Sequence, residues 1–265
     1  LNGLASKIHL VIYKNKREER SRFISFWTEE LPTLIHSLYR YLIYAFAIFG
    51  VAILIGVVSV LEDESFARLI LGDRYVNMTL DNIQNGNPMG VYASGDSLDM
   101  FFGITFNNIR VSFLAFAMGI IFSVGTGYII FQNGLIVGTF FTFLGQEGDL
   151  SHALSVVMLH GTIELTSIVI AGAAGFRLGH SILFPKTYSR SESVKQGAKD
   201  GLKLVVALIP FFIIAGFIES FLTRYENMPG LFKTVIIGFS SILIIYYFFV
   251  YPLKFKTHGA TVSKD

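Results

Sequence analysis

The chain has 265 residues, of which 52% are hydrophobic and only 15% are charged, and its formal net charge is +2. A soluble protein of this size carries roughly a quarter charged residues, so this composition excludes an ordinary soluble domain. The near balance of 21 Lys and Arg against 19 Asp and Glu gives no reason to expect nucleic-acid binding. The chain has no cysteine, which excludes disulfides, thiolate metal sites and a cysteine nucleophile.

Residues 1–40 predict a cytoplasmic arm built from amphipathic helices. Apolar residues recur there at helical spacing, first over 1–12 and again over 23–38. Trp27 is expected to anchor the second helix among lipid headgroups, and Pro32 is expected to bend it. Two uses of the arm are open: an interfacial elbow that leads into the first span, or a docking surface for a partner.

Long apolar runs after residue 40 predict about six transmembrane helices. Residues 111–146 contain no acidic or basic side chain, which is enough for two passes of about 20 residues each. The third segment is short for a crossing, so a re-entrant hairpin is the alternative there. The six segments are 41–60, 103–130, 132–144, 154–176, 204–221 and 231–251.

Lys and Arg are concentrated in connections that we therefore predict to be cytoplasmic. Residues 1–40 carry seven and residues 177–203 carry six, whereas residues 61–102 carry two beside seven acids. The positive-inside rule then places both termini in the cytoplasm of a multi-pass inner (cytoplasmic) membrane protein. The predicted parts are a cytoplasmic arm (1–40), a six-helix membrane domain (41–252) with an outer loop (61–102) and a cytoplasmic loop (177–203), and a cytoplasmic tail (253–265). The outer loop is rich in Gly, Asn and Asp, which favours irregular structure.

Polar and ionisable residues within the spans predict one layer in the outer half of the membrane. Glu164 lies near mid-bilayer, where an unpaired carboxylate is costly, so it is expected to be protonated or paired. We expect Arg110 to pair with Glu164 or with Glu219. The layer is either a hydrogen-bonded network that fixes helix register or an ion or proton pathway. Its members are Asn107, Asn108, Arg110, His160, Glu164 and Glu219.

Neither a metal site nor a catalytic site is predicted within the spans. His160 and Glu164 have the i, i+4 spacing of metal ligands, but a catalytic zinc needs three protein ligands. His152 and His180 point away from His160 around an ideal helix. The chain also lacks the HExxH and G-x-S-x-G motifs. We therefore expect no enzymatic activity, no metal and no cofactor.

Small residues recur every three or four positions in the second, third and fourth spans. This spacing lets helix backbones approach closely, and it predicts tight packing within the chain or, alternatively, a homo-oligomer. The glycines concerned are Gly119, Gly134, Gly138, Gly172, Gly175 and Gly179.

One stretch of the chain resembles a known family. The run His160-Gly161-Thr162-Ile163-Glu164-Leu165, with the Gly- and Ala-rich residues 170–179 after it, is similar to the signature of the stage II sporulation protein M family. Residues 107–110 with 116–120, and Asn133-Gly134 with Gly138, resemble the rest of its pattern.

The resemblance implies a polytopic membrane protein whose founding relative anchors peptidoglycan-degrading partners. It further implies membrane proteins as partners, such as an RDD-family protein, a MoxR-type ATPase or envelope enzymes, in addition to membrane lipids. We therefore expect a scaffold that assembles a cell-envelope complex. The alternative is a transporter or channel that uses the polar layer, although no internal repeat of the kind frequent in transporters is visible.

Overall fold

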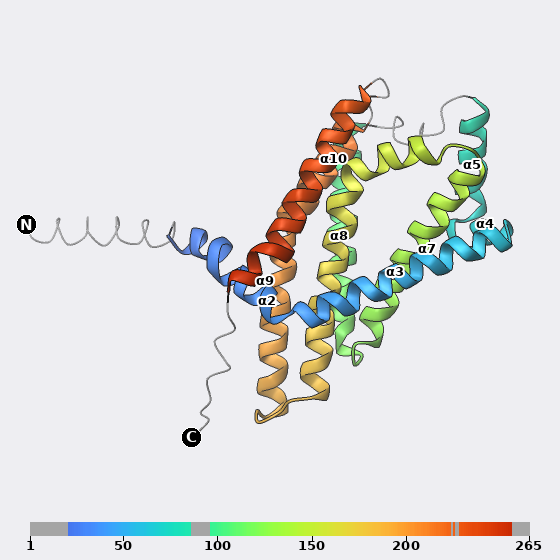
Figure 1. The fold of residues 1–265 in the computed structure, drawn as a ribbon. Coiled ribbons are helices and arrows are strands. Elements are labelled where there is room, and N and C mark those ends of the chain that lie inside the picture. Colours follow the sequence, from blue (N-terminus) through green and yellow to red (C-terminus); the bar gives the residue numbers. More distant parts are fainter. Residues whose placement is uncertain (1–20, 86–95, 224, 226–227, 256–265) are drawn as a thin grey trace, which may run out of the picture. The chain divides into compact units, whose positions relative to one another are not determined.

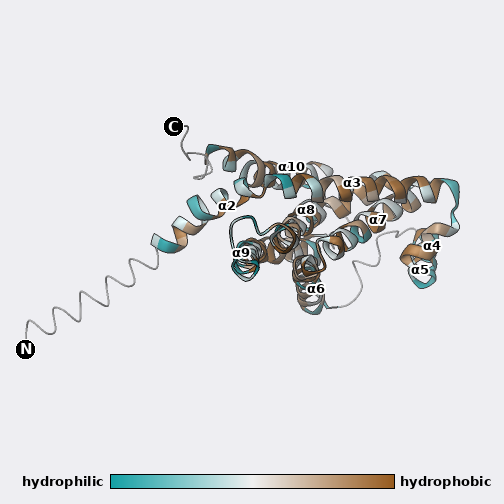
Figure 2. Ribbon diagram, turned by 90° about the horizontal axis from the view of Figure 1, so that it is seen from below, coloured by the Kyte–Doolittle hydropathy of each residue, from teal (hydrophilic) through white to brown (hydrophobic). Residues whose placement is uncertain are grey.

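The structure is a computed structural model that describes residues 21–85, 96–223, 225 and 228–255, which are helical with no strand among them (Figure 1). Six helices in these ranges are long and apolar enough to cross a membrane, which confirms the prediction of an all-α polytopic membrane protein. Figure 2 shows hydrophobic residues dominating the long helices and hydrophilic residues gathering towards helix ends. The predicted helix at 1–12, the Gly- and Asn-rich segment at 86–90 and most of the tail lie outside the described residues. The six helices span Tyr39–Glu62, Ser97–Ile120, Val124–Gln146, Leu150–Leu183, Arg190–Leu222 and Gly230–Lys254.

The chain divides into two compact units, Leu1–Ser37 with Ile245–Asp265, and Leu38–Ile244. In the first unit, the arm forms a π-helical turn, η1 (Phe26–Glu30), followed by α2 (Leu31–Ser37). The end of the chain forms η5 (Tyr246–Val250) and η6 (Tyr251–Lys254). The Tyr247 hydroxyl donates a hydrogen bond to the Trp27 carbonyl at 2.8 Å, and the Tyr251 hydroxyl donates one to the Thr28 carbonyl at 2.9 Å. Two tyrosine side chains near the end of the chain are thus hydrogen-bonded to backbone carbonyls of the arm.

In the second unit, α3 (Tyr39–Glu62) packs along α7 (Val124–Gln146). Glycines on both helices make this approach close. A Cβ added to Gly134 would lie 2.6 Å from the Phe49 carbonyl oxygen, and one added to Gly56 would lie 2.7 Å from that of Leu135. Neither position has room for a larger residue unless the backbones separate.

The outer loop contains two helices, α4 (Ser65–Leu71) and α5 (Asp73–Gln84), although an irregular segment was expected. Both are amphipathic enough to bury one face. Ala67 and Val76 join a hydrophobic cluster with the end of α3, the end of α7 and the start of α8 (Leu150–Leu183). Hydrogen bonds from Ser65 lower the pKa of Asp63, which precedes α4. The helices α4 and α5 therefore form a packed cap at this end of the bundle.

Helix α8 is the centre of the bundle and packs against α3, α6 (Ser97–Ala117), α7 and α9 (Arg190–Phe217). Its 34 residues span about 51 Å at 1.5 Å per residue, well beyond the ~30 Å hydrocarbon core. The sixth span begins as α10 (Gly230–Ile245) and is the least buried of the six.

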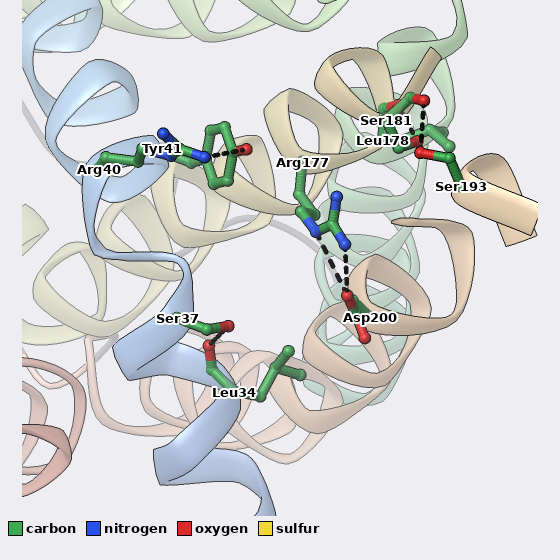
Figure 3. A network of polar contacts seen from close by, with 9 residues as sticks. All are labelled: Leu34, Ser37, Arg40, Tyr41, Arg177, Leu178, Ser181, Ser193 and Asp200. Atoms are coloured by element: carbon green, nitrogen blue, oxygen red, sulfur yellow. Dashed lines mark hydrogen bonds and ion pairs between the residues drawn. The ribbon is translucent and has the colours of Figure 1, made fainter. Parts of the chain in front are cut away.

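The ends of α8 and α9 opposite the cap continue into most of the predicted loop at 177–203. Only residues 184–189 lie outside helices there. Arg177 pairs with Asp200 at 3.0 Å, and the Ser193 hydroxyl donates to the Ser181 carbonyl at 2.8 Å (Figure 3). The Ser189 side chain accepts a hydrogen bond from the Glu192 amide and so caps α9.

The boundary between the second and third spans differs from the prediction. A short 3₁₀ segment, η3 (Met118–Ile120), ends the second span, and α7 begins at Val124 rather than near Gln132. The turn contains Phe122 and Ser123 at positive φ. Because this turn is apolar and lacks Gly or Pro, no sequence signal marks it. With 23 residues, α7 has the length of a full span. The predicted third span was too short because its start was placed eight residues too late, and the re-entrant alternative arose from that error.

Candidate functional site

Three ionisable side chains from the predicted polar layer meet beside the cap. His160 and Glu164 lie one turn apart on the same face of α8. Glu219 comes from η4 (Ile218–Leu222), a π-helical turn at the end of α9. The Nε2 atom of His160 is 3.7 Å from Oε1 of Glu219. One ligand atom from each of the three residues lies within 4.8 Å of the others, so we name them the His–Glu–Glu cluster.

The cluster is largely buried and has polar neighbours in α6 and just after η4. The His160 side chain is 6% exposed and that of Glu219 is 12% exposed. Thr223 places its hydroxyl 3.5 Å from Nδ1 of His160. The Asn108 side-chain amide comes within hydrogen-bonding reach of the Glu164 carboxyl group. One carboxyl oxygen of Glu164, Oε2, is buried and has no hydrogen-bond partner among the described residues.

The cluster lies deep in the bundle rather than at its surface. Arg177 lies towards the other end of α8. Glu164 is 13 residues before it, or about 20 Å along the helix, and His160 is about 26 Å before it. Arg177 and its partner Asp200 are a natural marker of the water boundary, because charged pairs are rare inside the hydrocarbon core. Along α8, His160 and Glu164 therefore lie well away from the Arg177–Asp200 pair, towards the start of the helix. The π-helical turn that carries Glu219 is a feature that is frequent at functional sites.

Arg110 does not join the cluster, and the expected pairing with Glu164 or Glu219 is wrong. Both Arg110 and Asn107 are exposed, whereas Asn108 is buried. Among the described residues, the ion pairs of the cluster do not include Arg110. The reason is helical phase: Asn108 shares its face with the buried residues Thr105 and Ser112, and at 100° per residue the side chains at 107 and 110 leave that face.

All six glycines predicted to pack helices lie at close approaches, five of them to a backbone and Gly172 to the Ile130 side chain. Gly134 and Gly138 of α7 face α3, at Phe49 and Ile53. The remaining contacts join α8 to the end of α6, to η3 and Ser123, and to the start of α7. The glycines there and their neighbours are Gly119 against Gly175, Gly172 against Ile130, Gly175 against Thr126 and Ala115, and Gly179 against Ser123.

Thr223 was not among the predicted site residues, although its hydroxyl lies 3.5 Å from Nδ1 of His160. Thr223 follows Glu219 by one turn, which was a usable signal. Ser220, the residue after Glu219 in η4, is fully buried, and its hydroxyl has no partner among the described residues. His152 and His180 stay away from the cluster, since His152 pairs with Asp149 at 3.3 Å and His180 contacts the Tyr41 ring. The third ionisable group of the cluster thus comes from η4, the turn that follows α9.

Comparisons with known proteins place these features in a family. The chain is 29% identical over 125 residues to the uncharacterized protein MJ0793 of Methanocaldococcus jannaschii, which covers 46% of this chain and 70% of the relative. It is 26% identical over 156 residues to the uncharacterized protein MJ0706 of the same organism, covering 58% of this chain and 68% of the relative. No solved structure matches.

A family model, stage II sporulation protein M, matches residues 45–224. The match covers more than half of the chain and contains every residue of the His–Glu–Glu cluster. Together with the six membrane-spanning helices, it shows that this multi-pass membrane protein belongs to the stage II sporulation protein M family.

Proposed function

We propose that the protein is a non-enzymatic scaffold of the inner (cytoplasmic) membrane that assembles a cell-envelope complex by binding other membrane proteins. The observation that carries the proposal is the exposed polar face of α6 formed by Asn107 and Arg110. Apolar side chains surround it, among them Phe106, which is 66% exposed.

The depth of Arg110 makes lipid a poor neighbour for this face. Arg110 follows Ser97, the first residue of α6, by about 20 Å and precedes Ile120 by about 15 Å along the helix. An Arg at the centre of a membrane helix costs ~2.5 kcal/mol or more on insertion scales. A carboxylate or carbonyl from a second membrane helix removes this cost, so the face fits a membrane partner that carries an acceptor at the same depth.

The partner classes implied by the family resemblance differ in how well they fit this face. An RDD-family membrane protein could reach α6 within the bilayer. A MoxR-type ATPase or another soluble protein would instead need a water-facing surface. A second copy of the chain is another candidate partner for this face. The experiment below distinguishes a second copy from a different protein.

The test is affinity purification from native membranes with quantification of the proteins that co-purify. Losing a contact worth ~2.5 kcal/mol weakens binding about 60-fold, so Arg110→Leu is expected to release the partner while Arg110→Lys retains part of it. Arg74→Leu is the matched control, because it removes one exposed Arg outside the spans.

Three results of this purification are informative. Release of a distinct protein by Arg110→Leu, but not by Arg74→Leu, supports the proposal. Release of only a differently tagged second copy would reduce the scaffold to a homo-oligomer. Equal recovery of all proteins with the three variants and the wild type would refute the role of this face.

The second candidate function is a transporter or channel, and the buried His–Glu–Glu cluster is the observation that favours it. Ionisable groups within the membrane commonly mark ion or proton pathways. A flux measured in proteoliposomes that is present in the wild type and lost in Glu164→Gln would establish transport. A scaffold would show no flux while keeping its partners.

A further inference from the structure

We infer that His160, Glu164 and Glu219 form a binding site for one divalent transition-metal ion of the Zn²⁺ class, which links α8 to the end of α9. The inference does not rest on the scaffold role. No metal was expected from the sequence because α8 alone supplies only two ligands, and the structure brings in Glu219 as the third.

The donor set fits such an ion. One imidazole nitrogen and carboxylate oxygens are ligands of Zn²⁺, and similar sets hold Mn²⁺ and Fe²⁺. Mg²⁺ and Ca²⁺ prefer oxygen ligands alone and fit an imidazole poorly. Helical bundles commonly hold metal ions with His and Glu side chains that project inward from facing helices. Here the side chains come from α8 and from the π-helical turn that ends α9.

The distances fit as well. Two ligands that bind one Zn²⁺ at about 2.1 Å with a tetrahedral angle lie about 3.4 Å apart. The observed distance from His160 Nε2 to Glu219 Oε1 is 3.7 Å. The remaining ligand atoms lie within 4.8 Å of one another. Small rotations of the Glu side chains therefore bring all three donors to one ion.

The charge and hydrogen bonding of the cluster point to a cation. Two carboxyl groups share a buried site, and among the described residues no Lys or Arg forms an ion pair with either of them. Oε2 of Glu164 is buried without a hydrogen-bond partner in the same part of the chain. Buried acceptors without partners are costly, more so in a membrane. A bound divalent ion would supply the missing positive charge, and Oε2 of Glu164 would coordinate it.

The surroundings provide groups that orient the ligands. Thr223 approaches Nδ1, the ring nitrogen of His160 that faces away from Glu219, at 3.5 Å. Metal-bound histidines usually have a polar partner at this second nitrogen, which fixes the ring. The Asn108 side-chain amide lies within hydrogen-bonding reach of the Glu164 carboxyl group and can orient it. Three protein ligands leave at least one coordination position for water or another small ligand.

The test is metal binding by the full chain purified in detergent. The protein is loaded with Zn²⁺ alone and desalted, and its metal is measured by inductively coupled plasma mass spectrometry. We expect about one Zn²⁺ per chain in the wild type. His160→Ala and Glu219→Gln are each expected to weaken Zn²⁺ binding by roughly 100-fold or more. His152→Ala, a histidine of the same helix outside the cluster, is expected to bind like the wild type.

Equal Zn²⁺ content in the wild type and the cluster variants would overturn the inference, as would no retained Zn²⁺ in a folded wild type. If a cluster variant does not fold, Co²⁺ binding to the wild type decides the matter. A bound Co²⁺ ion with tetrahedral nitrogen and oxygen ligands gives strong visible absorption bands, whereas a spectrum identical to that of free aqueous Co²⁺ would refute the site. Partner recovery is a separate readout, so failure of metal binding is distinguishable from failure of the scaffold role.

Discussion

Replacing Gly138 with alanine tests how tightly α3 and α7 are packed. A Cβ built at Gly138 lies 2.9 Å from the carbonyl carbon and the Cα of Ile53, and closer still to its carbonyl oxygen. These are backbone atoms, so no side chain can rotate away. Contacts below 3.4 Å are already tighter than nine in ten real Cβ contacts, so the two helices must separate by about 0.5 Å or more. Such overpacking costs about 1–3 kcal/mol.

Gly50→Ala is the matched control, because its added Cβ meets nothing within 4 Å. Both substitutions lie inside a membrane helix, and both gain about 0.5–1 kcal/mol of intrinsic helix stability. The difference in unfolding free energy between the two variants therefore isolates the packing cost, and Gly138→Ala should be less stable than Gly50→Ala by about 1–3 kcal/mol. Reversible unfolding by SDS in mixed micelles measures this difference. Equal stability, or greater stability of Gly138→Ala, would refute the close approach of α3 and α7.

Three further predictions address the ends of the helices. Because the chain has no cysteine, single-cysteine variants report sidedness: Tyr188→Cys should react with a membrane-impermeant maleimide only from the cytoplasm and Arg74→Cys only from outside, and the reverse pattern would invert the topology. The Asp96 side chain accepts a hydrogen bond from the Leu98 amide at the start of α6, so Asp96→Ala should lower the unfolding free energy by about 1 kcal/mol, whereas an unchanged value would show that the cap contributes nothing. A double-mutant cycle with Arg177→Leu and Asp200→Asn should give a coupling of about 1 kcal/mol for this partly exposed pair, and strictly additive effects would contradict it.

The six spans and the fold class could be predicted because apolar runs bounded by charges are a strong signal in a membrane protein. The turn between the second and third spans could not, because residues 121–123 are as apolar as the helices on either side. Close packing against the glycines of α8, rather than turn-forming residues, specifies that reversal: Ser123 lies against Gly179, and the Thr126 hydroxyl donates to the Ala115 carbonyl at 2.7 Å. The cap helices α4 and α5 were missed for a related reason, since Ala67 and Val76 gain their burial only from other elements.

The candidate site shows a second limit of prediction from sequence, which is that the direction of each side chain around its helix is not predictable. Depth along a span follows from counting residues, so the sequence placed His160, Glu164 and Glu219 at similar heights. Which way each side chain points depends on the rotation of every helix, and this is set by packing with other helices. In α6 the adjacent residues Asn107 and Asn108 differ by about 100°, so only Asn108 reaches Glu164. The same rotation that brings Asn108 inward turns Arg110 outward. Helix α6 therefore presents one polar face to the His–Glu–Glu cluster and another to the surroundings of the protein. A partner that binds Arg110 would contact the helix that also carries Asn108. Its binding is therefore expected to change the position of Asn108 relative to Glu164 in the cluster.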